Sequence, residues 1–248
     1  MSDFRDFQTR TTSGIDIRSA AEIDQGLRAY MLKVYNLMAL GVALTGLVAY
    51  AFAEMAGTAT NLTAFGQAIY MSPLRWVILL APLGLAFFMG FRLHAMSEAA
   101  AQITYWIYAA LVGASLSSIF LVYTNASIVQ TFAVTAASFG ALSLYGYTTK
   151  RSLSGMGTFL MMGLFGLIIA SVVNIFLQSS ALNFAVSVIG VLVFAGLTAW
   201  DTQQIKEMYL ESDDSETMGK KAIMGALTLY MDFINLFLFL LRFLGDRE

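Results

Sequence analysis

Long apolar runs separated by short polar segments dominate this sequence. A membrane-spanning helix needs roughly 20 apolar residues. Seven runs meet that length, at residues 30–53, 74–93, 102–123, 127–147, 157–177, 183–206 and 221–243. In lipid the backbone polar groups must bond within the segment, which favours helices, whereas the strands of a membrane barrel would be shorter and would alternate in polarity. The pattern predicts an all-α integral membrane protein, a bundle of seven transmembrane helices.

The N-terminal segment differs from the rest of the chain. Residues 1–28 carry acidic and basic side chains throughout and few apolar ones. Such a segment buries too little apolar surface to offset the entropy of ordering. The apolar run that follows it is too long for a signal peptide. We therefore expect a polar, cytoplasmic and poorly ordered tail at residues 1–28, followed by a seven-helix membrane domain at residues 29–248.

Composition excludes several classes of function. The chain is 58% hydrophobic and 12% charged, whereas soluble domains are about 25% charged. Its net charge is -2, and no basic patch interleaved with aromatic residues suggests a nucleic-acid partner. Cysteine is absent, which excludes disulfides and thiolate metal sites. A single histidine, His94, argues against a histidine metal site or a Ser-His-Asp triad.

Basic loops predict the orientation of the bundle. Lysine and arginine concentrate on the cytoplasmic side of membrane proteins. With a cytoplasmic N-terminus, the tail and three loops with basic residues fall on that side; those residues are Arg92, Lys150, Arg151, Lys206, Lys220 and Lys221. Full crossing by the last run would place Arg242 and Arg247 outside, a mild exception to the rule.

Two aspartates lie inside the last two apolar runs. They are Asp201, in LVFAGLTAWDTQQI, and Asp232, in LTLYMDFINLFLFLLRFLG. A carboxylate in a bilayer costs a few kcal/mol by most estimates, and it usually faces the bundle interior or a wet cavity. Asp201 could instead snorkel to water from its helix end, and Asp232 could simply hydrogen-bond a neighbouring helix. Asp232 is too deep to snorkel, at roughly 15 Å along its helix.

Taken together, the two aspartates suggest a pH-responsive site. They lie on consecutive spans joined by a short loop, so their carboxyl groups can meet if their depths match. Two carboxylates that close cannot both ionise cheaply, so they would share a proton and titrate as a unit. Losing that proton would push the helices apart or attract a cation. We expect a pH-responsive latch that serves as sensor and ion pathway.

Neighbouring polar residues could support this pair. Asn235 follows Asp232 by three residues and Gln204 follows Asp201 by three, so each shares a helix face with its aspartate. Calcium takes 6–8 oxygen ligands, so Asp201 and Asp232, helped by an amide and by backbone or water oxygens, would hold it weakly and transiently. No other cofactor is expected. Arg92 is either an anchor at the membrane surface or a counter-ion for Asp201.

The C-terminal motif resembles that of a known family. The segment LYMDFINLFLFLLRFLG, with WDTQQI upstream, is similar to the signature of the transmembrane Bax inhibitor motif family (Bax inhibitor-1-like), in its bacterial branch. The resemblance implies a bundle whose last helix is central and wrapped by six others. It also implies a passive, pH-sensitive calcium leak, governed by aspartates that match Asp201 and Asp232. Membrane proteases are possible partners of such proteins.

One motif of that family is altered here. Relatives carry an arginine near the inner end of the second helix that pairs with the first aspartate. In the matching stretch, FFMGFRLHAMS, Gly90 takes that place and Arg92 stands just beyond it. The loop between the aspartate-bearing runs is also long and acidic, through ESDDSET.

Three functions compete at this point. The first is a pH-sensitive passive calcium or cation leak channel of the bacterial inner membrane, gated by Asp201 and Asp232. The alternative is a non-transporting membrane regulator of stress response or protein quality control that acts through protein partners. An intramembrane aspartyl protease would also need two aspartates. Presenilin-like proteases place a glycine beside one of them, and neither Asp201 nor Asp232 has a glycine neighbour, so we expect no enzyme.

Overall fold

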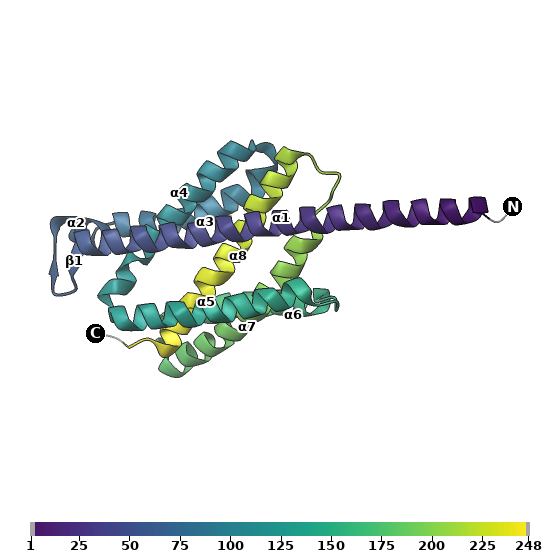
Figure 1. The fold of residues 1–248 in the computed structure, drawn as a ribbon. Coiled ribbons are helices and arrows are strands. Elements are labelled where there is room, and N and C mark those ends of the chain that lie inside the picture. The colour runs from purple at the N-terminus through teal and green to yellow at the C-terminus, as the bar shows by residue number, and fades with distance from the viewer. Residues whose placement is uncertain (1–2, 247–248) are drawn as a thin grey trace.

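The fold is a helical bundle (Figure 1), seen here in a computed structural model. The structure describes the backbone of residues 3–246 and the side chains of residues 24–93 and 95–246. Most of the tail expected at residues 1–28 therefore lies outside the described side chains. The elements are α1 (Asp3–Ala56), β1 (Gly57–Thr58), β2 (Asn61–Leu62), α2 (Ala64–Gly66), η1 (Gln67–Met71), α3 (Leu74–Arg92), η2 (Leu93–Ala95), α4 (Glu98–Leu116), η3 (Ser117–Leu121), α5 (Asn125–Thr148), α6 (Ser154–Leu177), α7 (Ser180–Glu207) and α8 (Ser215–Leu244).

The seven predicted spans are confirmed. Seven helices of the described chain are long and apolar enough to cross a membrane. Several begin a few residues before the apolar run because a polar residue caps the first turn. Ser97, Thr124, Ser179 and Asp214 each accept a hydrogen bond from the backbone N–H three residues on. Such caps satisfy donors that the helix itself leaves free.

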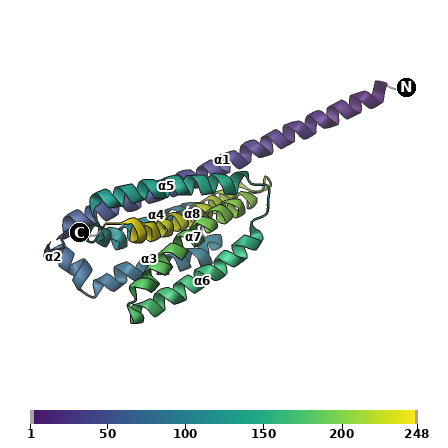
Figure 2. The same ribbon diagram turned by 90° about the horizontal axis from the view of Figure 1, so that it is seen from below.

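The last helix lies at the centre, as the family resemblance implied. In α8, 61% of the apolar stretch is buried inside the protein, the largest share among the seven spans. It packs against α1, α4, α5 and α7 (Figures 1 and 2).

The expectation of six wrapping helices needs a correction. α3 packs mainly on α4, and α6 mainly on α7. Only 11% of each apolar stretch is buried. Since lipid and protein interior are equally apolar, hydropathy cannot separate a wrapping helix from a peripheral one.

Tyrosines and one threonine close the contact between α8, α1 and α4. The Tyr230 hydroxyl lies 2.5 Å from Thr45 Oγ1, and the Tyr230 ring makes edge contacts with Tyr105 and Tyr108. The Tyr105 hydroxyl donates to the Leu37 carbonyl at 3.0 Å. All of these side chains are buried, and the hydroxyl groups of Tyr230, Thr45 and Tyr105 have hydrogen-bond partners.

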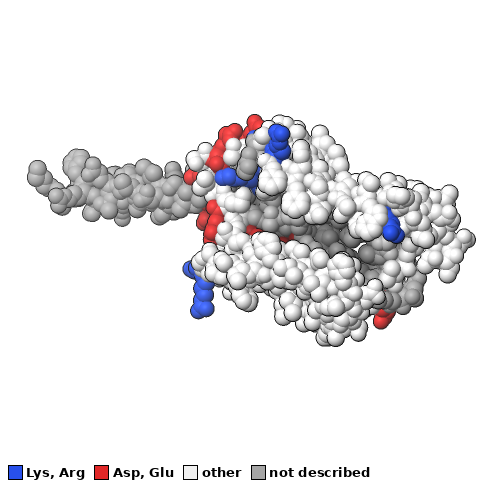
Figure 3. Space-filling view, turned by 180° about the vertical axis from the view of Figure 1, so that it is seen from behind, with Lys and Arg blue, Asp and Glu red and all other residues white. Residues whose placement is uncertain are grey.

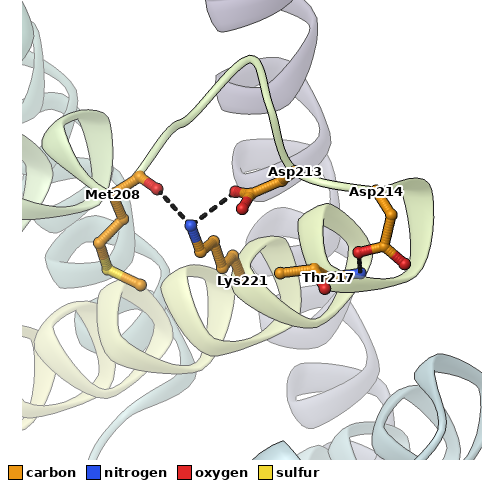
Figure 4. Close-up of polar contacts among 5 residues, drawn as sticks. All are labelled: Met208, Asp213, Asp214, Thr217 and Lys221. Atoms are coloured by element: carbon orange, nitrogen blue, oxygen red, sulfur yellow. Dashed lines mark hydrogen bonds and ion pairs between the residues drawn. The ribbon is translucent and has the colours of Figure 1, made fainter.

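A hydrogen-bonded turn sets α7 against α8 (Figure 4). The Lys221 ammonium donates to the Met208 carbonyl at 2.9 Å and to Asp213 Oδ2 at 2.6 Å. Asp214 accepts from the backbone N–H of Thr217 at 3.2 Å and so caps α8. Hydrogen bonds from Thr217 to Asp214, mainly from the Thr217 side chain and then from its backbone N–H, lower the pKa of Asp214 below its usual range. The turn therefore has a fixed geometry at the end of both aspartate-bearing helices.

Candidate functional site

Asp201 and Asp232 come together between α7 and α8. The two helices follow each other through a short turn and pack closely along their length, as antiparallel neighbours do. Their carboxyl groups lie within hydrogen-bond reach of each other. Asp232 is buried, with 5% of its surface exposed, and Asp201 is half-buried. The depths of the two residues match, which the sequence left open.

Among the described residues, neither carboxyl group has a hydrogen-bond donor other than its partner carboxyl group. In the described part of the chain, no backbone or side-chain N–H or O–H donates to Asp232 Oδ2. Within the described part of the chain, each carboxyl group has only the other carboxyl group as a hydrogen-bond partner. Two ionised carboxylates can only accept, so a proton between them or an outside donor must complete the pair.

The pair lies at the end of a cavity of about 730 Å³. α8 lines it with Thr228, Met231, Asp232, Asn235 and Phe239. These residues recur at intervals of three and four, so they form one stripe along the helix. Because the stripe covers only one side of α8, the helix can pack against α1 and α4 on its other side and still present Asp232 and Asn235 to the cavity.

Three further helices complete the wall. α7 contributes Phe194, Leu197, Trp200 and Asp201, and α6 contributes an apolar stripe that includes Leu164 and Ile168. α3 reaches the cavity with Leu83 alone. The cavity thus lies between α6, α7 and α8, with α3 at its edge, and α3 and α6 are the two least buried helices. Figure 3 shows a hollow between two largely uncharged parts of the surface.

Trp200 is a site residue that the sequence reasoning missed. Its indole packs directly on α6, where a Cβ built on Gly157 would lie 2.4 Å from the indole nitrogen. That nitrogen is buried and has no partner. The described chain has three such unpartnered side-chain atoms, and two of them, on Trp200 and Asp232, belong to residues that line this cavity. Its position beside Asp201 was the available signal.

Of the two polar residues expected to support the aspartates, Asn235 lies at the cavity and Gln204 does not. Asn235 lines the cavity beside Asp232. Its amide nitrogen donates to the Met231 carbonyl at 2.8 Å, so its side-chain oxygen is the group left to accept. Gln204 does not line the cavity; its amide donates to Glu207 Oε2 at 3.4 Å.

Arg92 is not brought to Asp201. It ends α3, is exposed, and does not line the cavity. Among the described residues it forms no ion pair. No contact in this structure therefore supports Arg92 as a counter-ion for Asp201.

The polar segment around Asp201 fixes the rotation of α7. The Thr202 hydroxyl lies 2.9 Å from Ser143 Oγ on α5, which in turn lies 2.6 Å from the Tyr35 hydroxyl on α1. Gln203 accepts from the Leu153 backbone N–H at 2.7 Å. Successive side chains of a helix point in different directions, so these bonds leave Asp201 facing the cavity.

Charged residues lie mainly at one end of the molecule. Figure 3 shows them gathered at one end of the drawn face, with few elsewhere. The ion pairs Lys33–Glu98, Lys220–Glu216 and Lys221–Asp213 involve the first turns of α4 and α8 and the polar end of α1. Asp201 and Asp232 are therefore the ionisable side chains among the residues that line the cavity.

Comparisons with known proteins identify relatives over nearly the whole chain. The family model Bax1-I, "Inhibitor of apoptosis-promoting Bax1", matches residues 27–248. The chain is 52% identical to protein RP147 of Rickettsia prowazekii, over 91% of this chain and 92% of the relative. It is 47% identical to the inner membrane protein YbhL of Escherichia coli, over 90% and 94%. It is 35% identical to the membrane protein SpyM3_0260 of Streptococcus pyogenes, over 91% and 96%.

Proposed function

The chain belongs to the Bax1-I family of membrane proteins, and from that premise we propose that it is a pH-sensitive passive cation leak of the bacterial inner membrane. Calcium is the proposed cation. Asp201 and Asp232 are the proposed pH sensor and part of the ion pathway. The proposal includes no catalytic step and no resident cofactor.

The isolation of the carboxyl pair carries this proposal. The two groups lie within hydrogen-bond reach, and the described chain supplies no other donor to them. Two adjacent carboxylates repel in a low-dielectric site, so the pair is most stable when it holds one proton. Removing that proton creates a repulsion between α7 and α8 that can be relieved by separation or by a cation. The pair thereby converts pH into a change in helix contact.

The oxygen ligands in the cavity suit a calcium ion that passes through better than one that stays bound. Calcium takes 6–8 oxygen ligands. The cavity offers the two carboxyl groups and the side-chain oxygen of Asn235, so water would have to supply the remaining ligands. Such a site is weak, as a leak pathway requires, because an ion must leave it as readily as it enters.

The charge distribution supports a cytoplasmic N-terminus. Basic residues at the start of α8 and at the end of α7 share the charged end with the polar end of α1. Positive charge favours the cytoplasmic side. Under this orientation seven spans place the C-terminus on the opposite side.

Calcium flux into dye-loaded proteoliposomes tests the proposal. Flux is measured from about pH 5 to 8, and we expect a pH-dependent leak that loses this dependence in Asp232→Asn. Glu216→Gln is the matched control, because it removes another carboxylate from α8 at the exposed Lys220 pair, away from the cavity. No leak above empty liposomes at any pH would reject the channel. The regulator that acts through protein partners, such as a membrane protease, would then be the better account.

A further inference from the structure

The cavity beside the aspartate pair opens sideways. Leu83 and Ile168 lie near the middle of α3 and α6 and line its mouth, and 54% and 51% of their surfaces are exposed. Residues at mid-span face the hydrocarbon layer rather than the water on either side. The mouth therefore connects the aspartate pair to the lipid interior.

The shape and lining suit a ligand with a long apolar part. A volume of about 730 Å³ falls within the 300–1,000 Å³ range of small-molecule sites. The hydroxyls of Ser171 and Thr228 line the cavity, but they donate to the carbonyls of Leu167 and Met224 on their own helices. Apart from the polar end, the ligand would meet hydrocarbon side chains.

The part of the cavity lined by Asp201 and Asp232 requires a hydrogen-bond donor from the ligand, and it favours a positively charged one. Asp232 Oδ2 is buried and accepts no hydrogen bond from the described chain. The residues that line the cavity include two aspartates and no lysine, arginine or histidine. A primary ammonium has three donors and no acceptor, and charge-assisted hydrogen bonds to carboxylates are the strong ones. An anionic head would be repelled there.

We propose that this cavity binds a cationic amphiphile from the membrane, a long-chain aliphatic amine. Its ammonium group meets the carboxyl groups of Asp201 and Asp232, and its chain lies along the apolar stripe of α6. The inference uses the same carboxyl pair as the proposed leak but does not require ion flux. A bound amine would occupy the cavity and supply the positive charge that the protein lacks there.

Quenching of Trp200 fluorescence by a brominated amine measures this binding directly. Trp76→Phe and Trp106→Phe together leave Trp200 as the only tryptophan. The protein is placed in lipid nanodiscs and titrated with a brominated long-chain primary amine, then with the brominated alcohol of equal chain length. A hydrogen bond to a charged group is worth about 1.5–3 kcal/mol, so the amine should quench at concentrations at least about tenfold lower. Equal quenching by both compounds would overturn the inference.

Substitutions in two cavities locate the site. Ser171→Phe should weaken amine quenching because it fills this cavity. Ser115→Phe is the matched control, since that serine lines a separate cavity of about 330 Å³ between α3 and α4. Asp201→Asn and Asp232→Asn should each remove the preference for the amine. A preference that survives in both aspartate variants would overturn the inference.

The binding test is independent of the flux test. Amine binding with no calcium leak would retain this inference and reject the proposed function. A pH-dependent leak with no preference for the amine would do the reverse.

Discussion

The two sides of α8 differ in how their polar groups are satisfied. Tyr230 and Asp232 are two residues apart, so they point about 200° away from each other around the helix. Tyr230 meets Thr45 and a tyrosine cluster in a closed contact with α1 and α4. Asp232 meets Asp201 at the end of a cavity and has no donor from the described chain.

This difference separates stability from function within one helix. A buried hydrogen bond contributes about 1 kcal/mol, whereas an unsatisfied buried polar group costs about 1–3 kcal/mol. The Tyr230 side therefore holds the bundle together, and the Asp232 side weakens it. Native structures retain unsatisfied groups mainly where they serve a purpose. The packing of the other helices is consistent with this division, because the peripheral helices α3 and α6 both line the cavity on the Asp232 side.

The largest expected effect is at the closed contact between α1 and α4. A Cβ on Gly113 would lie 2.6 Å from the Thr45 carbonyl oxygen, which is backbone and cannot move aside. Gly113→Val should lower the free energy of unfolding by about 3 kcal/mol. Gly140→Val is the control, since nothing lies within 4 Å of a Cβ there. Denaturant titration in detergent measures both variants, and equal losses would contradict a closed contact at Gly113.

Opposite substitutions on α8 should change stability in opposite directions. Tyr230→Phe removes the hydroxyl that contacts Thr45 and should cost about 1 kcal/mol. Asp232→Leu combined with Asp201→Leu removes both carboxyl groups together, so neither is left without a partner, and this double variant should increase stability by about 1 kcal/mol. The same titration measures both, with the pH dependence of calcium flux as a second readout. Retained pH dependence in the double leucine variant, or its loss in Tyr230→Phe, would contradict the proposed division between the two sides of α8.

The turn between α7 and α8 should contribute less. Lys221→Gln removes an ion pair with Asp213 whose side chains are 24% and 13% exposed. An ion pair that keeps contact with water contributes about 1 kcal/mol, so we expect a smaller loss than at Gly113. Deuterium exchange at residues 208–214 should quicken in Lys221→Gln. Lys220→Gln, which removes only the Glu216 pair, should leave that exchange unchanged.

The helix cap of α8 should show the smallest effect, with a defined pH dependence. The hydrogen bonds to Thr217 lower the pKa of Asp214 in the folded protein. Their stabilisation is therefore present above the ordinary carboxyl pKa of about 4 and is lost as pH falls through the lower folded value. Asp214→Ala should reduce the thermal midpoint at neutral pH. The gap from wild type should narrow in acid, and a gap that widens there would contradict this role for the cap.

The sequence predicted the spans and the aspartate pair well, for physical reasons. Hydropathy decides which segments enter lipid, and a carboxylate in such a segment stands out because burying it is costly. Asp201 and Asp232 could be paired because consecutive helices joined by a short loop are neighbours.

The cavity and the directions of nearby side chains could not be predicted in the same way. Lipid and the bundle interior are both apolar, so the pattern did not reveal that α3 and α6 are peripheral. Gln204 shares a helix face with Asp201 on paper, yet it contacts Glu207. The expected role of Arg92 as a counter-ion required a tertiary contact with Asp201, which sequence spacing alone does not determine. Trp200 read as an ordinary apolar residue because its indole nitrogen matters only once the cavity is known.

A double-mutant cycle of calcium flux against pH tests the central claim most directly. It compares wild type, Asp201→Asn, Asp232→Asn and the double variant in proteoliposomes. If the carboxyl groups share one proton, each single substitution should abolish the pH dependence and the second should add nothing. Independent and additive effects of the two substitutions would contradict the shared-proton account.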